Sequence, residues 1–276
     1  MSKIGVFDSG YGGLTILKEL KLALPQFDFV YLGDNARAPY GDRSFDVVHE
    51  YTWQCVKWLF EKDCDLVILA CNTASAKALR AIQQTDLPAY NLNASKPKRV
   101  LGVIRPTTEI VGNITKTNKI GIVGTLGTVK SESYVIEIGK FFPQVKVYQE
   151  ACPIWVHLIE NELLGLDGTD FFVKYHLDRL FAQDSEIDTL ILACTHYPLL
   201  LDSIEKVVPS QVKVMAQGEI IALSLANYLE RHPDFTGNLS QNSTVQFYTS
   251  EVYKNFNALA TVFYGSTVVS KHADIA

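Results

Sequence analysis

Short apolar runs alternate with longer stretches of mixed apolar and polar residues along most of the chain. The apolar runs are bounded by turn-forming residues and predict strands near residues 3–7, 28–32, 65–70, 100–104, 120–124, 145–149, 188–193, 212–216 and 244–249. The stretches between them carry apolar residues at the spacing of amphipathic helices. Strands that alternate with helices are typical of an α/β fold with a mainly parallel sheet.

Two segments of the chain recur at nearly the same separation. The segment KIGVF at 3–7 resembles KIGIV at 119–123, an offset of 119 − 3 = 116 positions. The segment LVILACNT, which holds Cys71, resembles LILACTH, which holds Cys194, and these cysteines lie 194 − 71 = 123 positions apart. A repeat of this kind predicts two similar α/β lobes related by a pseudo-twofold axis. The polar stretch 91–99 has the composition of a linker, so we expect the second lobe to begin near residue 98.

Polar residues follow several of the predicted strands directly. The carboxyl ends of parallel strands lie at one edge of a sheet, where helix N-termini present unpaired N–H groups to ligands. The residues at these positions are Asp8, Ser9, Cys71, Asn72, Thr125, Cys194, Thr195 and His196. If the lobes face each other, Cys71 and Cys194 approach one site from opposite sides. We therefore expect the active site in the cleft between the lobes.

Composition and charge narrow the classes of function. With 276 residues, 47% of them apolar, the chain is long enough for two domains with sizeable cores. Its 25 basic and 30 acidic residues give a net charge of -5, which disfavours nucleic acid or an anionic membrane as the primary ligand. We see no secretory signal or membrane-length apolar run, and we expect a cytoplasmic protein. Five cysteines without paired short spacing predict reduced thiols, not disulfides or a zinc site.

Two opposed thiols suit the inversion of a stereocentre by proton exchange. Such a reaction needs a base on one face and an acid on the other, with the roles reversed in the opposite direction. A helix N-terminus can lower the pKa of a thiol from about 8.5 towards neutrality. Asp8 is placed to accept a proton or to orient a substrate ammonium, and His196 to polarise Cys194. No metal or cofactor is required for this chemistry.

Hydroxyl and amide side chains near the same strand ends provide partners for carboxylates. They are Ser9, Asn72, Thr73, Thr125, Thr128 and Thr195. A small molecule with an ammonium group and one or two carboxylates is the expected substrate. Structural roles compete with these assignments: Asp8, Thr125 and Thr128 are also good helix caps. For Cys55, Cys64 and Cys152 we expect a buried structural role.

Three other classes of function remain open on the residues alone. A dinucleotide-binding oxidoreductase is suggested by the glycine-rich turn 10–15 after the first strand and by Asp34 after the second, although Thr15 breaks the fingerprint. A hydrolase would use Cys194 and His196, but residues two apart seldom align as nucleophile and base. A non-catalytic binding protein explains the cleft but gives the paired thiols no purpose.

The ordered motifs of the chain resemble those of bacterial glutamate racemases in the aspartate/glutamate racemase family. The motifs are GVFDSGYGGLT (5–15), YLGDNARAPYGDRS (31–44), ILACNTASA (68–76), GVIRPT (102–107), IGIVGTLGTVKSESY (120–134), ACP (151–153) and ILACTHYPLL (191–200). The resemblance implies that Cys71 and Cys194 are the catalytic acid/base pair, without pyridoxal phosphate or metal.

The resemblance also implies which residues surround the thiols. Residues that contact the substrate or support the cysteines would be Asp8, Ser9, Tyr40, Gly41, Asn72, Thr73, Thr195 and His196. Glu160 matches a glutamate that lies behind them, although it also fits a solvated helix position. Tyr40 and Gly41 lie in a Pro-Tyr-Gly sequence that by itself indicates a turn.

Further expectations from the resemblance concern organisation and biology. The second lobe would span 98–210, and the tail 211–276 would return to the first lobe, 1–97. The product D-glutamate would supply peptidoglycan synthesis, and the chain would form a homodimer. Aspartate racemase is the near alternative. The chain departs from the family pattern at Ala216-Gln217-Gly218-Glu219, where an Asp-Ser pair is usual, and at Ala193 and His157, where glycine and proline are common.

Overall fold

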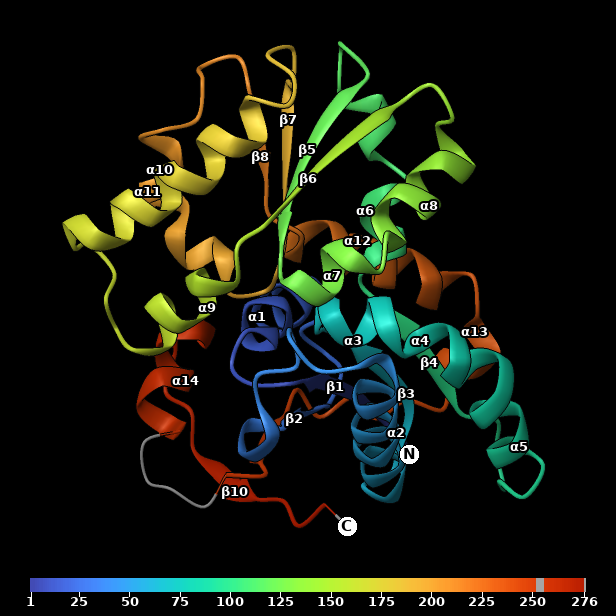
Figure 1. Ribbon diagram of the computed structural model, residues 1–276. Coiled ribbons are helices and arrows are strands. Elements are labelled where there is room, and N and C mark those ends of the chain that lie inside the picture. Colours follow the sequence, from blue (N-terminus) through green and yellow to red (C-terminus); the bar gives the residue numbers. More distant parts are fainter. Residues whose placement is uncertain (252–255, 276) are drawn as a thin grey trace.

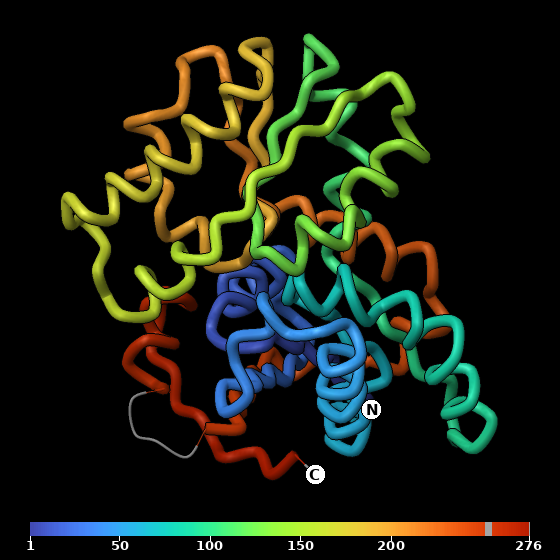
Figure 2. Tube along the Cα trace, in the orientation of Figure 1, coloured from blue at the N-terminus to red at the C-terminus, as the bar shows by residue number. Residues whose placement is uncertain are grey.

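Two parallel β-sheets, each covered by helices, form two lobes that lie one above the other in Figure 1. The computed structural model describes residues 1–251 and 256–275. The lower lobe in that view holds both termini, and the trace in Figure 2 passes between the lobes more than once. The predicted α/β class and two-lobe arrangement are therefore confirmed.

The first sheet has six strands in the order β10-β9-β2-β1-β3-β4. Its strands are β1 (Lys3–Asp8), β2 (Phe29–Gly33), β3 (Cys64–Leu69), β4 (Arg99–Gly102), β9 (Val245–Thr249) and β10 (Ser270–His272). Every pairing in it is parallel. β1, β2 and β3 are almost wholly buried, as expected for strands covered by helices on both faces. β10 was not expected, because three half-exposed residues leave no apolar run to detect.

The second sheet has four parallel strands in the order β6-β5-β7-β8. They are β5 (Lys119–Gly124), β6 (Lys146–Ala151), β7 (Thr189–Ala193) and β8 (Lys213–Met215). Four neighbouring strands of the first sheet, β2-β1-β3-β4, have the same order as β6-β5-β7-β8 in the second sheet. The duplication inferred from two short repeated segments thus extends over four strands in each lobe.

Helices connect these strands and cover both sheets. In the first half they are α1 (Gly13–Ala23), η1 (Asn35–Arg37), α2 (Phe45–Glu61), α3 (Asn72–Lys77), α4 (Leu79–Ala81), η2 (Ile82–Asp86), α5 (Leu87–Asn91), α6 (Ile104–Thr108) and η3 (Val111–Asn113). In the remainder they are α7 (Leu126–Lys130), α8 (Ser133–Phe141), α9 (Pro153–Glu160), α10 (Asp167–Phe181), η4 (Tyr197–Leu200), α11 (Leu201–Glu205), α12 (Gly218–Glu230), α13 (Pro233–Thr236) and α14 (Phe256–Tyr264). None of the helices in the described part of the chain has the length and apolar content of a membrane span.

The lobe boundaries differ from the expected 97/98 and 210/211. β4 pairs with β3 in the first sheet, and β8 pairs with β7 in the second. The polar stretch 91–99 therefore connects α5 to β4 within the first lobe and does not link the halves. Apolar patterning marks a strand but not its pairing partner, which is why both boundaries were placed too early. We propose that the repeats end at β4 and β8.

The tail after β8 returns to the first lobe, in line with the expectation for most of 211–276. α12 packs along α1, and β9 and β10 extend the first sheet beyond β2. Apolar residues of α1, α12 and α14 share one buried cluster with Trp155 and Leu177 of the second lobe. Burial of apolar surface thus holds the two lobes together on one side of the molecule.

Candidate active site

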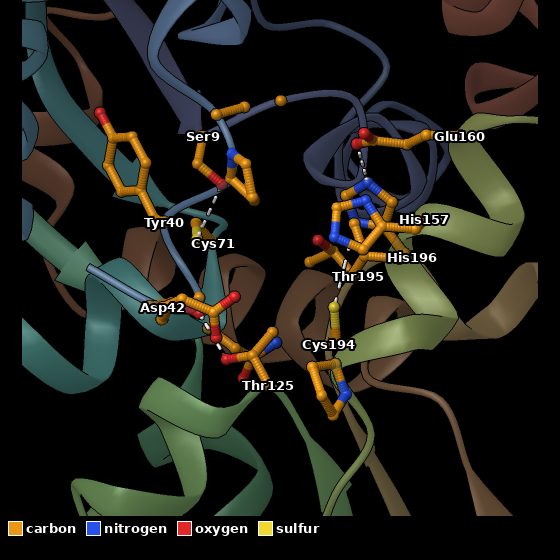
Figure 3. Close-up of a pocket in the computed structure, with 18 residues that line it drawn as sticks. Ser9, Tyr40, Asp42, Cys71, Thr125, His157, Glu160, Cys194, Thr195 and His196 are labelled. Atoms are coloured by element: carbon orange, nitrogen blue, oxygen red, sulfur yellow. Dashed lines mark hydrogen bonds and ion pairs between the residues drawn. The ribbon is translucent and has the colours of Figure 1, made fainter.

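A small cavity lies at the carboxyl ends of β3 and β7, where the lobes meet. It is lined by Ser9, Gly10, Ala38, Pro39, Tyr40, Gly41, Asp42, Cys71, Asn72, Thr73, Thr125, Pro153, Val156, His157, Glu160, Cys194, Thr195 and His196. Figure 3 places Cys71 beside Ser9 and Cys194 beside His196, on different sides of this space. The structure therefore brings both predicted thiols to one cavity.

The volume of the cavity is about 40 Å³. The two lobes therefore lie close together around the site in this structure.

Cys71 follows β3 and forms the N-cap of α3. Its Sγ accepts a hydrogen bond from the backbone N–H of Ala74 at 3.4 Å and lies 3.4 Å from Ser9 Oγ. Burial and the nearby carboxyl of Asp8 raise the pKa of Cys71 to about 12, in spite of these two contacts. The helix N-terminus alone predicted a lowered pKa, and burial outweighs it. Cys71 therefore carries its proton near neutral pH.

Cys194 follows β7 and lies next to an imidazole. Its Sγ is 3.9 Å from His196 Nδ1, and His196 Nε2 pairs with Glu160 Oε1 at 2.8 Å. Burial alone would lower the pKa of His196, but the contacts with Cys194 and Glu160 raise it to about 10. His196 is thus a cation at neutral pH, and its Nδ1 faces the sulfur of Cys194. Residues two apart in a chain were expected to align poorly with each other. Cys194 and His196 nevertheless face each other, because both lie on the turn between β7 and η4.

Asp8 lies behind the cavity wall and is not one of the lining residues. Its side chain is buried, with Oδ2 accepting the N–H of Gly10 at 2.8 Å and Oδ1 accepting the Thr195 hydroxyl at 3.4 Å. Burial raises the pKa of Asp8, although the positive charge of His196 opposes the shift. In this conformation Asp8 acts on the site through its charge and through Ser9 and Gly10, which do line the cavity.

Threonines from both lobes meet at the edge of the cavity. Thr73 Oγ1 lies 2.8 Å from Thr125 Oγ1, and Thr125 also caps α7 by accepting the N–H of Thr128. Thr128 is fully buried behind Thr125 and does not line the cavity. Thr125 therefore both caps α7 and lines the cavity, two roles that the sequence left as alternatives. Thr128 lies behind Thr125 and supports it.

Tyr40 and Gly41 line the cavity from the loop between β2 and α2. The Tyr40 hydroxyl donates to Asp34, which also accepts from Arg37 Nε at 2.7 Å and from Ser250 Oγ at 2.7 Å. Asp34 is fully buried, so its carboxylate fixes the loop and has no free face for a ribose.

The glycine-rich turn after β1 also has a packing role. A Cβ at Gly12 would overlap with the side chains of Thr195 and His196. The glycine lets the start of α1 approach the second lobe closely, which a phosphate-binding loop does not require. Neither part of the dinucleotide fingerprint is therefore available to a dinucleotide in this structure.

Several lining residues were missed by sequence reasoning. Pro39 and Val156 carry no reactive group, and the carboxylate of Asp42, within the motif 31–44, was not singled out. All three reach the cavity because neighbouring motif residues do. His157 was noted only as a departure from the family pattern, yet it is exposed at the cavity. These residues lie next to the motifs PYG and ACP in the sequence, and that closeness was the signal that could have identified them.

The other three cysteines lie outside the cavity. Cys55, Cys64 and Cys152 are fully buried, and burial raises the pKa of each thiol. These positions agree with the structural role expected for them. Among residues 1–251 and 256–275, no three His, Cys, Asp or Glu side chains gather as a metal-binding set.

Comparisons with known proteins identify the family of the chain. The model of the Asp/Glu/Hydantoin racemase family matches residues 15–223. A glutamate racemase of Persephonella marina is 38% identical over 268 residues, which cover 96% of this chain and 94% of the relative. The crystal structure of a glutamate racemase isoform of Bacillus anthracis matches with a TM-score of 0.88 at 35% identity and covers 99% of this chain and 98% of the other.

A second solved structure, the glutamate racemase of Francisella tularensis in complex with D-glutamate, matches with a TM-score of 0.85 at 32% identity. That match covers 100% of this chain and 97% of the other. The sequence relatives and the fold agree over nearly the whole chain, and the family model agrees over residues 15–223. The chain therefore belongs to the Asp/Glu/Hydantoin racemase family.

Proposed function

We propose that the chain interconverts L- and D-glutamate by moving the α-proton between Cys71 and Cys194. One observation supports this most strongly: the two thiols reach a single buried cavity from different lobes. A nucleophilic hydrolase needs one such sulfur, and a binding protein needs none. The glutamate racemases among the relatives favour glutamate over aspartate.

The protons balance in each turnover. In one direction the Cys194 thiolate removes the α-proton and becomes a thiol, and the electron pair stays on the α-carbon, delocalised towards the neighbouring carboxylate. The Cys71 thiol then gives its proton to the opposite face of that carbon and becomes a thiolate. The reverse direction exchanges the two roles. Before a second turnover in the same direction, Cys194 releases its proton to solvent and Cys71 takes one up, so the protons balance over the full cycle.

The charges around the thiols support this division of roles. The raised pKa of Cys71 keeps a proton available as the acid, and the His196 imidazolium stabilises the base form of Cys194. Glu160 holds His196 in place and keeps it charged. We propose Cys71 and Cys194 as catalytic residues and Glu160 as a positioning residue that acts through His196.

Donor groups on the cavity wall fit a dicarboxylate. Asn72, Thr73, Thr125 and Thr195 present an amide and hydroxyls, and we propose that they bind the substrate carboxylates with Ser9. The buried carboxyl of Asp8 provides negative charge on the side where an ammonium would lie. Closure of the lobes then excludes water and strengthens these interactions around the carbanionic intermediate.

The proposed function is tested with enantiopure L-glutamate in deuterium oxide and no added cofactor. We expect optical rotation to fall to zero while deuterium enters the α-position, as polarimetry and NMR would record. D-Glutamate must give the same end point, and L-aspartate in parallel tests the alternative substrate. No change in rotation, with protein that circular dichroism shows to be folded, would refute the proposal.

We further propose that the product D-glutamate supplies peptidoglycan synthesis in the cytoplasm and that the chain acts as a homodimer. Both proposals rest on the family resemblance. Light scattering on the purified protein tests the second one, and a monomer mass at micromolar concentration would exclude it.

A further inference from the structure

Gln217 lies two residues after the end of β8, at the N-cap of α12, and is almost fully buried. Its amide is hydrogen-bonded at every position. Oε1 accepts from Asn72 Nδ2 at 2.8 Å, and Nε2 donates to Thr107 Oγ1 at 2.9 Å and to the Tyr134 hydroxyl at 2.6 Å. The cavity lining does not include Gln217 itself, so any effect on the reaction passes through a neighbour.

The network closes on itself through Tyr134. The Tyr134 hydroxyl donates to Asn72 Oδ1 at 2.6 Å, so Asn72, Gln217 and Tyr134 form a ring of three hydrogen bonds. All three residues are buried, and a buried amide that loses a partner is costly. The ring therefore fixes the orientation of the Asn72 amide.

The position of Asn72 gives this ring a function. Asn72 is the residue after Cys71 and lines the cavity. The ring uses its carbonyl oxygen and one of its two N–H groups. One N–H of the amide is left for a ligand in the cavity.

The ring also joins the two lobes. Asn72 begins α3 of the first lobe, Tyr134 belongs to α8 of the second, and Gln217 follows the last strand of the second sheet. The ring therefore depends on the arrangement of the two lobes in this structure.

We propose that Gln217 is a positioning residue that aligns the Asn72 amide for the substrate when the lobes close. This inference rests on the proposed function, because Asn72 acts only if the cavity binds the amino acid. Replacing Gln217 leaves both thiols and His196 in place. It frees the Asn72 amide to rotate and weakens substrate binding.

A double-mutant cycle tests the inference on the full chain. Gln217→Met keeps the length of the side chain and removes all three hydrogen bonds. We expect kcat/KM to fall about tenfold, mainly through a higher KM, because a misaligned amide weakens ground state and transition state alike. In an Asn72→Ala background the same substitution should change kcat/KM less than about twofold, since its target is absent.

Thr107→Val is the matched control. It removes one partner of Gln217 but leaves the ring with Asn72 intact, so kcat/KM should change less than about threefold. If Gln217→Met does not fold, Tyr134→Phe replaces it in the cycle, because it removes the donor to Asn72 Oδ1.

Two results would overturn the inference. One is an equal loss of kcat/KM with and without Asn72. The other is a lower kcat with unchanged KM, which a smaller fraction of folded enzyme explains. A wild-type protein that does not racemise glutamate would instead refute the proposed function.

Discussion

The two sides of the cavity share a plan but give their cysteines different neighbours. Cys71 has a hydroxyl, a backbone N–H and a buried carboxyl nearby, whereas Cys194 faces an imidazole held by a carboxylate. The repeat places a thiol at each strand end, and residues that differ between the two halves, such as His196, give each thiol its surroundings. We infer that Cys71 keeps its proton near neutral pH, whereas the sulfur of Cys194 faces the positive charge of His196.

This asymmetry has a limited effect on rates. Enantiomers have equal free energies in water, so kcat/KM must be the same in both directions of a racemisation. The difference between the two sides therefore appears in kcat and KM taken separately. Variants that alter one side are the way to expose it.

Loss of either sulfur is expected to have the largest effect. Cys71→Ser and Cys194→Ser each remove one of the two groups that exchange the proton, and a serine hydroxyl is a far weaker acid than a thiol. We expect racemisation to fall at least about a thousandfold in each variant, measured by circular dichroism of glutamate. If either variant racemised glutamate at a rate within tenfold of the parent enzyme, the two cysteines could not both be needed for the proton exchange.

Removing the cation beside Cys194 is expected to have the next largest effect. His196→Asn leaves a polar side chain but no positive charge, so the thiolate loses its partner. We expect kcat to fall about a hundredfold. The parent enzyme should lose activity as pH rises through about 10, where His196 becomes neutral. The pH profile of His196→Asn should not show this loss of activity at alkaline pH. If the variant shows the same loss, a group other than His196 causes it.

Glu160 affects the same side less strongly. Glu160→Gln keeps a hydrogen-bond acceptor for His196 but removes the negative charge that raises its pKa. The alkaline loss of activity should therefore move to lower pH, with kcat reduced about tenfold at pH 8. Glu162→Gln, two residues further on and exposed, is the matched control. Equal profiles for the two variants would contradict the role of Glu160.

The smallest effect concerns the Cys71 side. Asp8→Asn keeps an acceptor for the N–H of Gly10 but removes a negative charge that raises the pKa of Cys71. More Cys71 should then be thiolate at pH 9, and iodoacetamide should modify it several-fold faster. Mass spectrometry in a Cys194→Ser background assigns the modified site. A rate no faster than in the parent background would mean that Asp8 does not affect the proton on Cys71.

Much of the fold could be predicted because its signals are local. Each main strand is an apolar run of its own, and the segments around Cys71 and Cys194 reveal the duplication directly. The pairing of β4 and β8 depends on partners far along the chain, so the lobe boundaries were misplaced. β10 could not be predicted because it contains no apolar run.

The candidate site likewise contains residues that the sequence could predict and residues that it could not. Motif residues such as Asn72 and Thr195 line the cavity as expected, because a strand end fixes where they point. Asp8 follows a strand too, but its carboxyl turns inward to Gly10 and Thr195. The proton affinity of Cys71 depends on burial by both lobes, which no local sequence pattern encodes.

The most direct test of the account is deuterium exchange by the single-cysteine variants. Each variant retains one thiol, which can remove and return a proton on one face of the α-carbon only. In deuterium oxide, Cys71→Ser should label one enantiomer of glutamate without inverting it, and Cys194→Ser should label the other. Labelling of the same enantiomer by both variants, or of both enantiomers by either one, would contradict proton exchange between two opposed thiols.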